Sequence, residues 1–242
     1  MPQSLQNPIT HPEGHDQRWK DLYRIGAFNA ILVAVLIALA IAAFFIWPFA
    51  AGEASTLEVF EALQADRIGT LISLDISLLL IQVIYIPLLL ALYMALKPVN
   101  ESWALIAVVF GLVAIVLSII IRPVAELSLL SDLHAASSEA EKMRYLAAGE
   151  AMLSVFNGTS WIVATILIGL SGLIEALLMR RSPVFRKATA IVGIITVLPA
   201  LLFFLPVVGK LLLLLNTLLS IVWMVQIALD LTHYTKQVNA GQ

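Results

Sequence analysis

Three ionisable residues, Asp75, Arg122 and Glu126, lie within or at the ends of long apolar stretches. A guanidinium beside a carboxylate can form an ion pair, hold the polar group of a ligand or take part in proton transfer. Because an ionisable group in lipid is costly, such a group is read first as a functional-site candidate with a partner. Arg122 precedes Pro123, and Glu126 follows Arg122 by four positions, which puts both on one face of a helix.

If the apolar stretches are membrane-spanning helices, five polar residues lie at a similar depth in the membrane. They are Asp75, Arg122, Glu126, Glu150 and Asn157. We predict that they bind a ligand in an outward-opening polar pocket between the second, third and fourth spans. Arg122 would be its centre, with Asp75 or Glu126 as the counter-charge. The alternative is structural: an arginine–carboxylate clasp, or an arginine that reaches the interface with its stem in lipid.

Enzyme signatures are largely missing from the sequence. It has no paired-histidine zinc helix, no Gly-x-Ser-x-Gly elbow and no phosphate-binding loop of the Walker type. It also has no cysteine, which excludes disulfides, thiolate metal sites and a cysteine nucleophile. We therefore expect no cofactor and no metal ion, and we assign no catalytic residue.

Composition points to a membrane protein. Of the 242 residues, 61% are hydrophobic and only 12% are charged, and the mean hydropathy is +0.97. Soluble domains are about half apolar and about one quarter charged, so water-soluble packing could not hide this much apolar surface. The net charge of -2 gives no general attraction for nucleic acid, and we expect membrane lipids as partners instead.

Six apolar segments are long enough to cross about 30 Å of hydrocarbon as helices. They are Ile25–Trp47, Ile68–Leu96, Trp103–Ile121, Met152–Met179, Ala188–Leu205 and Leu211–Leu231. The second is longer than needed, which predicts a tilt or a kink at Pro87. Leu57–Ala65 is expected to form a short surface helix. In the third connection, Ser138-Glu139-Ala140-Glu141 has the form of a capping box that opens another helix.

Lysine and arginine residues set the expected orientation. Nine fall on the side of the termini: Arg18, Lys20, Arg24, Lys97, Arg180, Arg181, Arg186, Lys187 and Lys236. Five fall on the other: Arg67, Arg122, Lys142, Arg144 and Lys210. Since positive residues favour the cytoplasmic side, both termini are predicted to be cytoplasmic.

The predicted fold is all-α, an integral membrane bundle of six transmembrane helices in the cell (inner) membrane. A short amphipathic helix is expected in the extracytoplasmic loop between spans three and four. Residues 1–23 form a polar N-terminal tail, residues 24–231 the transmembrane domain, and residues 232–242 a polar C-terminal tail.

Short motifs along most of the chain resemble a known family. They are Tyr23–Gly26, Leu74–Ile76, Ile86–Tyr93, Asn100–Ser102, Glu126–Ser131, Ala147–Ala151 and Asn157–Thr159. The chain resembles, roughly from residue 23 to 231, the uncharacterised bacterial six-span membrane proteins grouped as domain of unknown function 4386. The resemblance implies that Asp75, Glu126 and Glu150 are polar positions shared by the family. Arg122 departs from the small polar residue expected there, which would make it a specialisation of this chain.

The resemblance implies no activity, so three function classes stay open. The first is a protein that binds, and in one form moves, a small-molecule or lipid ligand in the outward-facing pocket. The second is a structural or regulatory membrane subunit without its own ligand. The third is an intramembrane enzyme acting on a lipid, with Glu126, Glu150 or His134 as acid or base. The lack of catalytic motifs favours the first two.

Overall fold

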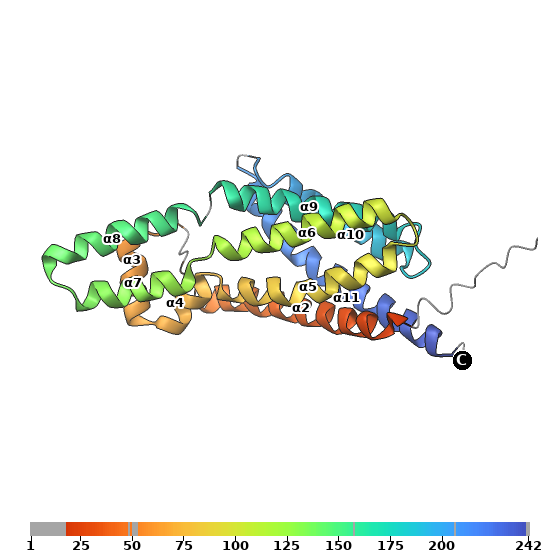
Figure 1. Cartoon of the computed structure of the whole chain (residues 1–242). Helices are drawn as coiled ribbons and strands as arrows, with labels where there is room; N and C mark the ends of the chain where they lie inside the picture. The colour runs from red at the N-terminus through yellow and green to blue at the C-terminus, as the bar shows by residue number, and fades with distance from the viewer. Residues whose placement is uncertain (1–17, 48, 50–52, 157, 206, 241–242) are drawn as a thin grey trace, which may run out of the picture.

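The structure is a computed structural model that describes residues 18–47, 49, 53–156, 158–205 and 207–240. Over these residues all regular secondary structure is helical. The helices are α2 (Lys20–Ile46), α3 (Thr56–Ala65), α4 (Arg67–Ser73), α5 (Ile76–Leu96), α6 (Glu101–Ile120), α7 (Val124–Ala136), α8 (Glu139–Ser154), α9 (Thr159–Met179), α10 (Lys187–Leu201) and α11 (Gly209–Ala240). The start of α2 and the end of α11 lie at the same end of the molecule (Figure 1).

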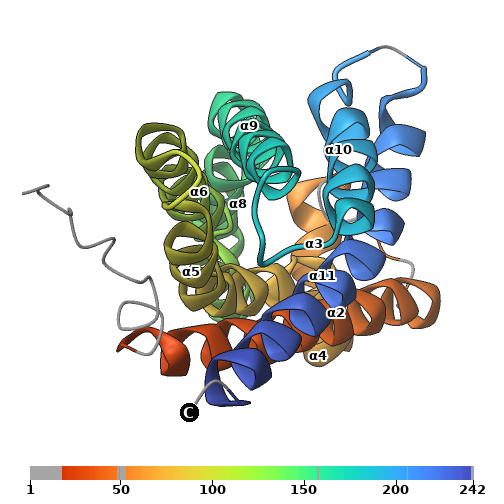
Figure 2. The same ribbon diagram turned by 90° about the vertical axis from the view of Figure 1, so that its right-hand side faces the viewer.

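Six helices form a closed ring in the order α2, α5, α6, α9, α10 and α11, and α11 returns to pack on α2 (Figure 2). In the part of the chain that is described, five helical segments are long and apolar enough to span a membrane. The remaining ring helix, α10, has 15 residues and is shorter. The prediction of an all-helical membrane bundle is therefore confirmed, with five qualifying spans.

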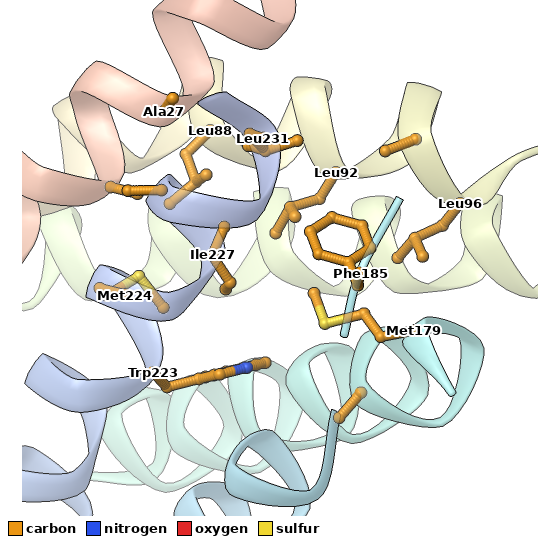
Figure 3. Packing of buried hydrophobic residues seen from close by; sticks show 14 of the residues in the cluster. Ala27, Leu88, Leu92, Leu96, Met179, Phe185, Trp223, Met224, Ile227 and Leu231 are labelled. Carbon is orange, nitrogen blue, oxygen red and sulfur yellow. The ribbon is translucent and has the colours of Figure 1, made fainter. Parts of the chain in front are cut away.

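The ring is held by apolar residues and by small residues that let helices approach. Its core includes Leu88, Leu92, Met179, Trp223 and Ile227 (Figure 3). Large apolar side chains such as those of α2 also remain exposed on its outer surface. An exposed apolar surface of this extent is expected of a protein surrounded by lipid.

The other four helices, α3, α4, α7 and α8, form an end layer beyond the ring (Figure 1). Val59 and Phe60 of α3 pack with Leu127 of α7 in a second apolar cluster. Arg67 at the start of α4 binds Asp132 of α7 at 2.8 Å. The predicted surface helix at Leu57–Ala65 is present as α3, and a capping box between Ser55 and Glu58 fixes its start and lowers the pKa of the Glu58 carboxyl.

Several predicted boundaries differ from the structure. The second apolar segment is divided at Leu74–Asp75 into α4 and α5, whereas α5 continues through Pro87, where the tilt or kink was expected. The connection between α6 and α9 holds two helices, α7 and α8, in place of one short amphipathic helix. At the chain ends, α11 continues through most of the predicted C-terminal tail, and residues 1–17 of the N-terminal tail lie outside the described part.

Candidate functional site

Arg122 occupies the break between α6 and α7, and its side chain is only 3% exposed. The break forms because Pro123 begins the next helix and supplies no N–H donor. The guanidinium Nε donates to Oδ2 of Asp75 at 3.0 Å. Another nitrogen, Nη1, donates to the main-chain carbonyl of Phe156 at 2.6 Å. The predicted pairing of Arg122 with Asp75 is therefore present.

Asp75 lies at a second break, between α4 and α5. Its φ angle of 64° is in the left-handed region, which Asp tolerates better than most non-glycine residues because its short polar side chain can bond locally. The side chain remains 43% exposed while it accepts the bond from Arg122. The ion pair therefore joins a buried cation to a half-exposed carboxylate.

Phe156 lies at a third break, between α8 and α9. Its carbonyl accepts from Arg122, and its ring lies 4.0 Å from the guanidinium carbon. The ring of Trp161 on α9 contacts the same guanidinium at 4.6 Å. Two aromatic faces around a planar cation are a favourable cation–π arrangement, worth roughly 1–2 kcal/mol when the cation is desolvated.

These contacts bring three helix breaks together at one level, and we call Arg122, Asp75, Phe156 and Trp161 the Arg122 clasp. A break in a helix leaves backbone carbonyls without intrahelical donors, and inside an apolar bundle water cannot replace them. Arg122 donates to one of these carbonyls, that of Phe156, and its positive charge also pairs with the carboxylate of Asp75. Its geometry is that of a residue that fixes the junction between the ring and the end layer.

The other predicted site residues do not join Arg122. Glu126 on α7 and Glu150 on α8 are exposed, and neither has an ion pair or a side-chain hydrogen bond with another described residue. Asn157 lies outside the described residues. Of the five candidates, the structure thus joins Asp75 and Arg122 directly.

A cavity of about 210 Å³ lies inside the ring, between α2, α5, α9, α10 and α11, and we call it the central cavity. Its polar lining residues are Gln82, Tyr85, Thr196, Asn216, Ser220 and Trp223. Asn216 donates to the carbonyl of Thr196 at 2.8 Å, so this side chain also joins α11 to α10. The rest of the lining is mostly apolar, and the cavity therefore offers hydrogen-bonding groups within apolar walls.

Buried polar atoms without partners lie on the helices around this cavity. Within the described part of the chain, the indole N–H of Trp223, Oε2 of Glu175 and Oε1 of Gln226 have no hydrogen-bond partner. Glu175 is 2% exposed and lies one turn after Gly172, a cavity residue on α9. An unpaired buried polar group costs about 1–3 kcal/mol, so these atoms mark the region as one where a ligand would find uncommitted partners.

Glu175, Gln226 and Asp230 are polar residues of apolar helices, for which the simplest interpretation is a helix cap or an interface anchor. Asp230 fits this interpretation, because it is buried and accepts bonds from Arg186 and from the hydroxyl of Thr189 at the start of α10. Glu175 does not fit it, since its carboxyl lies in the bundle interior. The seven-residue spacing of Asp75 and Gln82 would put both on one face of a continuous helix, but the helix starts after Asp75 and Gln82 alone of the two lines the cavity.

Acidic and histidine side chains are also potential metal ligands. Among the described residues, no group of three or more histidine, aspartate or glutamate side chains is arranged to hold a metal ion. His134 instead packs its ring at 5.5 Å from that of Phe60, within the end layer.

Comparison with known proteins gives a family model that matches most of the chain. The family model described as Domain of unknown function (DUF4386) matches residues 28–232, from the first turns of α2 to the C-terminal part of α11. No curated protein and no solved structure matches the chain.

Proposed function

The chain belongs to the family described as Domain of unknown function (DUF4386), and we propose that it is a multi-pass membrane protein that binds a small or lipidic ligand inside its helix ring. The supporting observation is the central cavity, whose polar residues come from helices far apart in the sequence. Sequence reasoning put the ligand near Asp75 and Arg122, at the outer end of the same ring.

The topology proposed for this function has six spans. It includes α10 with the five longer segments, puts both termini in the cytoplasm of a bacterial cell and puts the end layer outside the inner membrane. The support is the excess of lysine and arginine on the side of the termini.

Because the chain has no cysteine, single introduced cysteines report this topology directly. Ala140→Cys lies in the end layer, and Lys236→Cys lies near the end of α11, both at exposed positions. A membrane-impermeant maleimide should label Ala140→Cys on intact cells and Lys236→Cys only after permeabilisation. The reverse pattern would reject the proposed orientation.

The size and lining of the central cavity define the class of ligand. About 210 Å³ is below the ~300–1,000 Å³ of sites for drug-sized ligands, so the occupant is small or is one part of a lipid. The lining carries amide, hydroxyl and indole groups but no charged side chain. An uncharged molecule with both polar and apolar groups fits this chemistry best.

The Arg122 clasp lies toward the outer end of this site. Asp75 precedes Gln82 by seven residues on α5, which corresponds to roughly 10 Å along a helix. Arg122 is bonded to Asp75 and to Phe156, so its part in this proposal is to hold the helix ends beyond the outer side of the cavity in place.

Native mass spectrometry of the purified chain in mild detergent tests the proposal. The wild type should retain a small molecule or lipid fragment, and Gln82→Leu should lose it, because leucine keeps the size of the side chain and removes its amide. Val83→Leu is the matched control, since Val83 is the next residue and is exposed on the outer surface. Retention by all three proteins in equal amount, or by none, would count against the cavity.

A structural or regulatory subunit is the second candidate function. The observation that favours it is the Arg122 clasp itself, in which Nε and Nη1 of the arginine are bonded within the chain. If the chain is such a subunit, a protein partner should co-purify with it in defined stoichiometry. Gln82→Leu should then leave that complex intact. Formation of a product from added lipid by the purified chain would support an enzyme instead.

A further inference from the structure

A second cavity, of about 600 Å³, opens at the end of the ring opposite the end layer, and we call it the basic groove. It lies over α9, between α6 on one side and α10 on the other. Its lining includes Arg180, Arg181, Lys187, Trp103, Leu177 and Ile191. From this lining we propose that the basic groove binds an anionic phospholipid, with the phosphate at the three cations and an acyl chain along α9 and α10.

The cations of the groove are not neutralised within the described part of the chain. Arg180, Arg181 and Lys187 are exposed and form no ion pair there, whereas the neighbouring Arg186 is engaged by Asp230. On α6, the acid nearest to Trp103 is Glu101, which pairs with Lys97 at 3.1 Å. The groove therefore keeps three positive charges for an anion from outside the chain.

The groove changes from charged to apolar along the helix axes. The cations lie at the end of α9 and the start of α10, and Leu177 and Ile191 lie about one turn further into the ring. The two apolar side chains are exposed, as is the ring of Trp103. Tryptophan is enriched at membrane interfaces, where its apolar ring and polar N–H match the headgroup region. This order of groups matches a lipid that enters with its chains toward the bilayer centre.

The charge of the headgroup decides the class of lipid. A zwitterionic headgroup presents its phosphate together with a cation that three basic side chains would repel, whereas phosphatidylglycerol carries a net negative charge. Each lysine or arginine near an anionic surface contributes about 1 kcal/mol, or about fivefold in affinity. This site is separate from the central cavity, and its occupancy does not depend on the ligand proposed there.

The test compares two double variants of the full-length chain that change the net charge equally. Arg180→Gln with Arg181→Gln removes two cations of the groove. Arg24→Gln with Lys236→Gln removes two exposed cations from the same end of the ring but outside the groove. Each protein, in mild detergent, is titrated with phosphatidylglycerol and with phosphatidylcholine of the same acyl chains, and bound lipids are counted by native mass spectrometry.

The wild type should prefer phosphatidylglycerol, and the groove variant should lose this preference by about tenfold or more, while the control keeps it within about twofold. An unchanged preference in the groove variant, or an equal loss in the control, would overturn the proposal. If the groove variant does not fold, Lys187→Gln is compared with Arg24→Gln in the same way.

A second experiment distinguishes a phospholipid from a free phosphate compound as the ligand of the basic groove. Ile191→Trp should fill the apolar part of the groove and lower the binding of phosphatidylglycerol while leaving all three cations in place. Glycerol phosphate should not displace the lipid, because it lacks the acyl chain. Displacement by glycerol phosphate, together with normal binding in Ile191→Trp, would show a site for the phosphate alone and overturn the lipid assignment.

Discussion

The side chain of Arg122 donates to the main-chain carbonyl of Phe156 at 2.6 Å, although the two residues are 34 positions apart. This bond joins the end of α6 to the break before α9, and the bond to Asp75 adds the break before α5. The end layer is therefore attached to the ring at a point where one buried cation serves several chain segments.

Replacing Arg122 by glutamine should destabilise the fold by roughly 2–4 kcal/mol, because the carbonyl of Phe156 and the carboxylate of Asp75 lose their donor. Thermal unfolding in detergent measures the effect. Asp75→Asn should destabilise the Arg122→Gln variant less than it destabilises the wild type, since the two side chains bind each other. Additive losses would argue that Arg122 and Asp75 stabilise the protein independently.

Gly193 of α10 faces the ring of Trp223 so closely that a Cβ atom there would lie 2.6 Å from Cε2 of the indole. Gly193→Val should therefore cost about 1–3 kcal/mol through overpacking. Trp223→Leu in the same chain should recover part of the loss by making room. Ala188→Val, at an exposed position of the same helix, is the control and should leave the melting temperature nearly unchanged.

Asp230 and Glu175 are both buried acids, but Asp230 accepts several hydrogen bonds whereas one carboxyl oxygen of Glu175 has no partner among the described residues. Asp230→Asn should lower stability by about 1–3 kcal/mol, because the bonds from Arg186 and Thr189 lose their ionic acceptor. Glu175→Gln keeps the size of the side chain and removes an acid whose Oε2 has no partner among the described residues, so it should not lower stability. The melting temperatures of both variants are measured in the same detergent. A larger decrease in melting temperature for Glu175→Gln than for Asp230→Asn would contradict this prediction.

Asn29 of α2 donates to the carbonyl of Ile84, three residues before Pro87. Asn216 of α11 has the same relation to Thr196 and Pro199. Because proline removes a helical donor and crowds the preceding turn, we expect Asn29→Leu to cost about 1 kcal/mol. Pro87→Ala removes the ring that crowds this turn, so the carbonyl of Ile84 can bond the helical N–H of Leu88 and Asn29→Leu should cost less in that background. Equal costs in both backgrounds, in denaturant titrations, would show that the amide does not compensate for the proline.

The sequence predicted the ring helices well because their signal is local: an apolar stretch of sufficient length must find lipid or protein on every side. It also predicted that Arg122 pairs with Asp75 or Glu126, since a buried cation needs an opposite charge at its own depth, and the structure has the pair with Asp75. Both inferences depend on residue type and on position along a helix. Neither requires knowledge of how the helices are turned about their axes.

The remaining features depend on those rotations and on the backbone. The acceptor at Phe156 is a main-chain carbonyl, which every residue carries, so no side chain predicts it. The break at Asp75 arises from one left-handed residue in an apolar stretch that otherwise reads as continuous helix. The central cavity forms only where particular faces of five helices meet, and periodicity in highly apolar helices does not distinguish those faces.

The short α10 has a consequence for the surrounding bilayer. Its 15 residues extend about 22 Å, against about 30 Å of hydrocarbon, and its first residue is the charged Lys187. If α10 crosses the membrane, lipids beside it must thin locally, while those beside the 27-residue α2 need not. The protein would then sense bilayer thickness on one flank only. Its melting temperature in bilayers of increasing acyl-chain length should pass through a maximum at thinner membranes than α2 alone would favour.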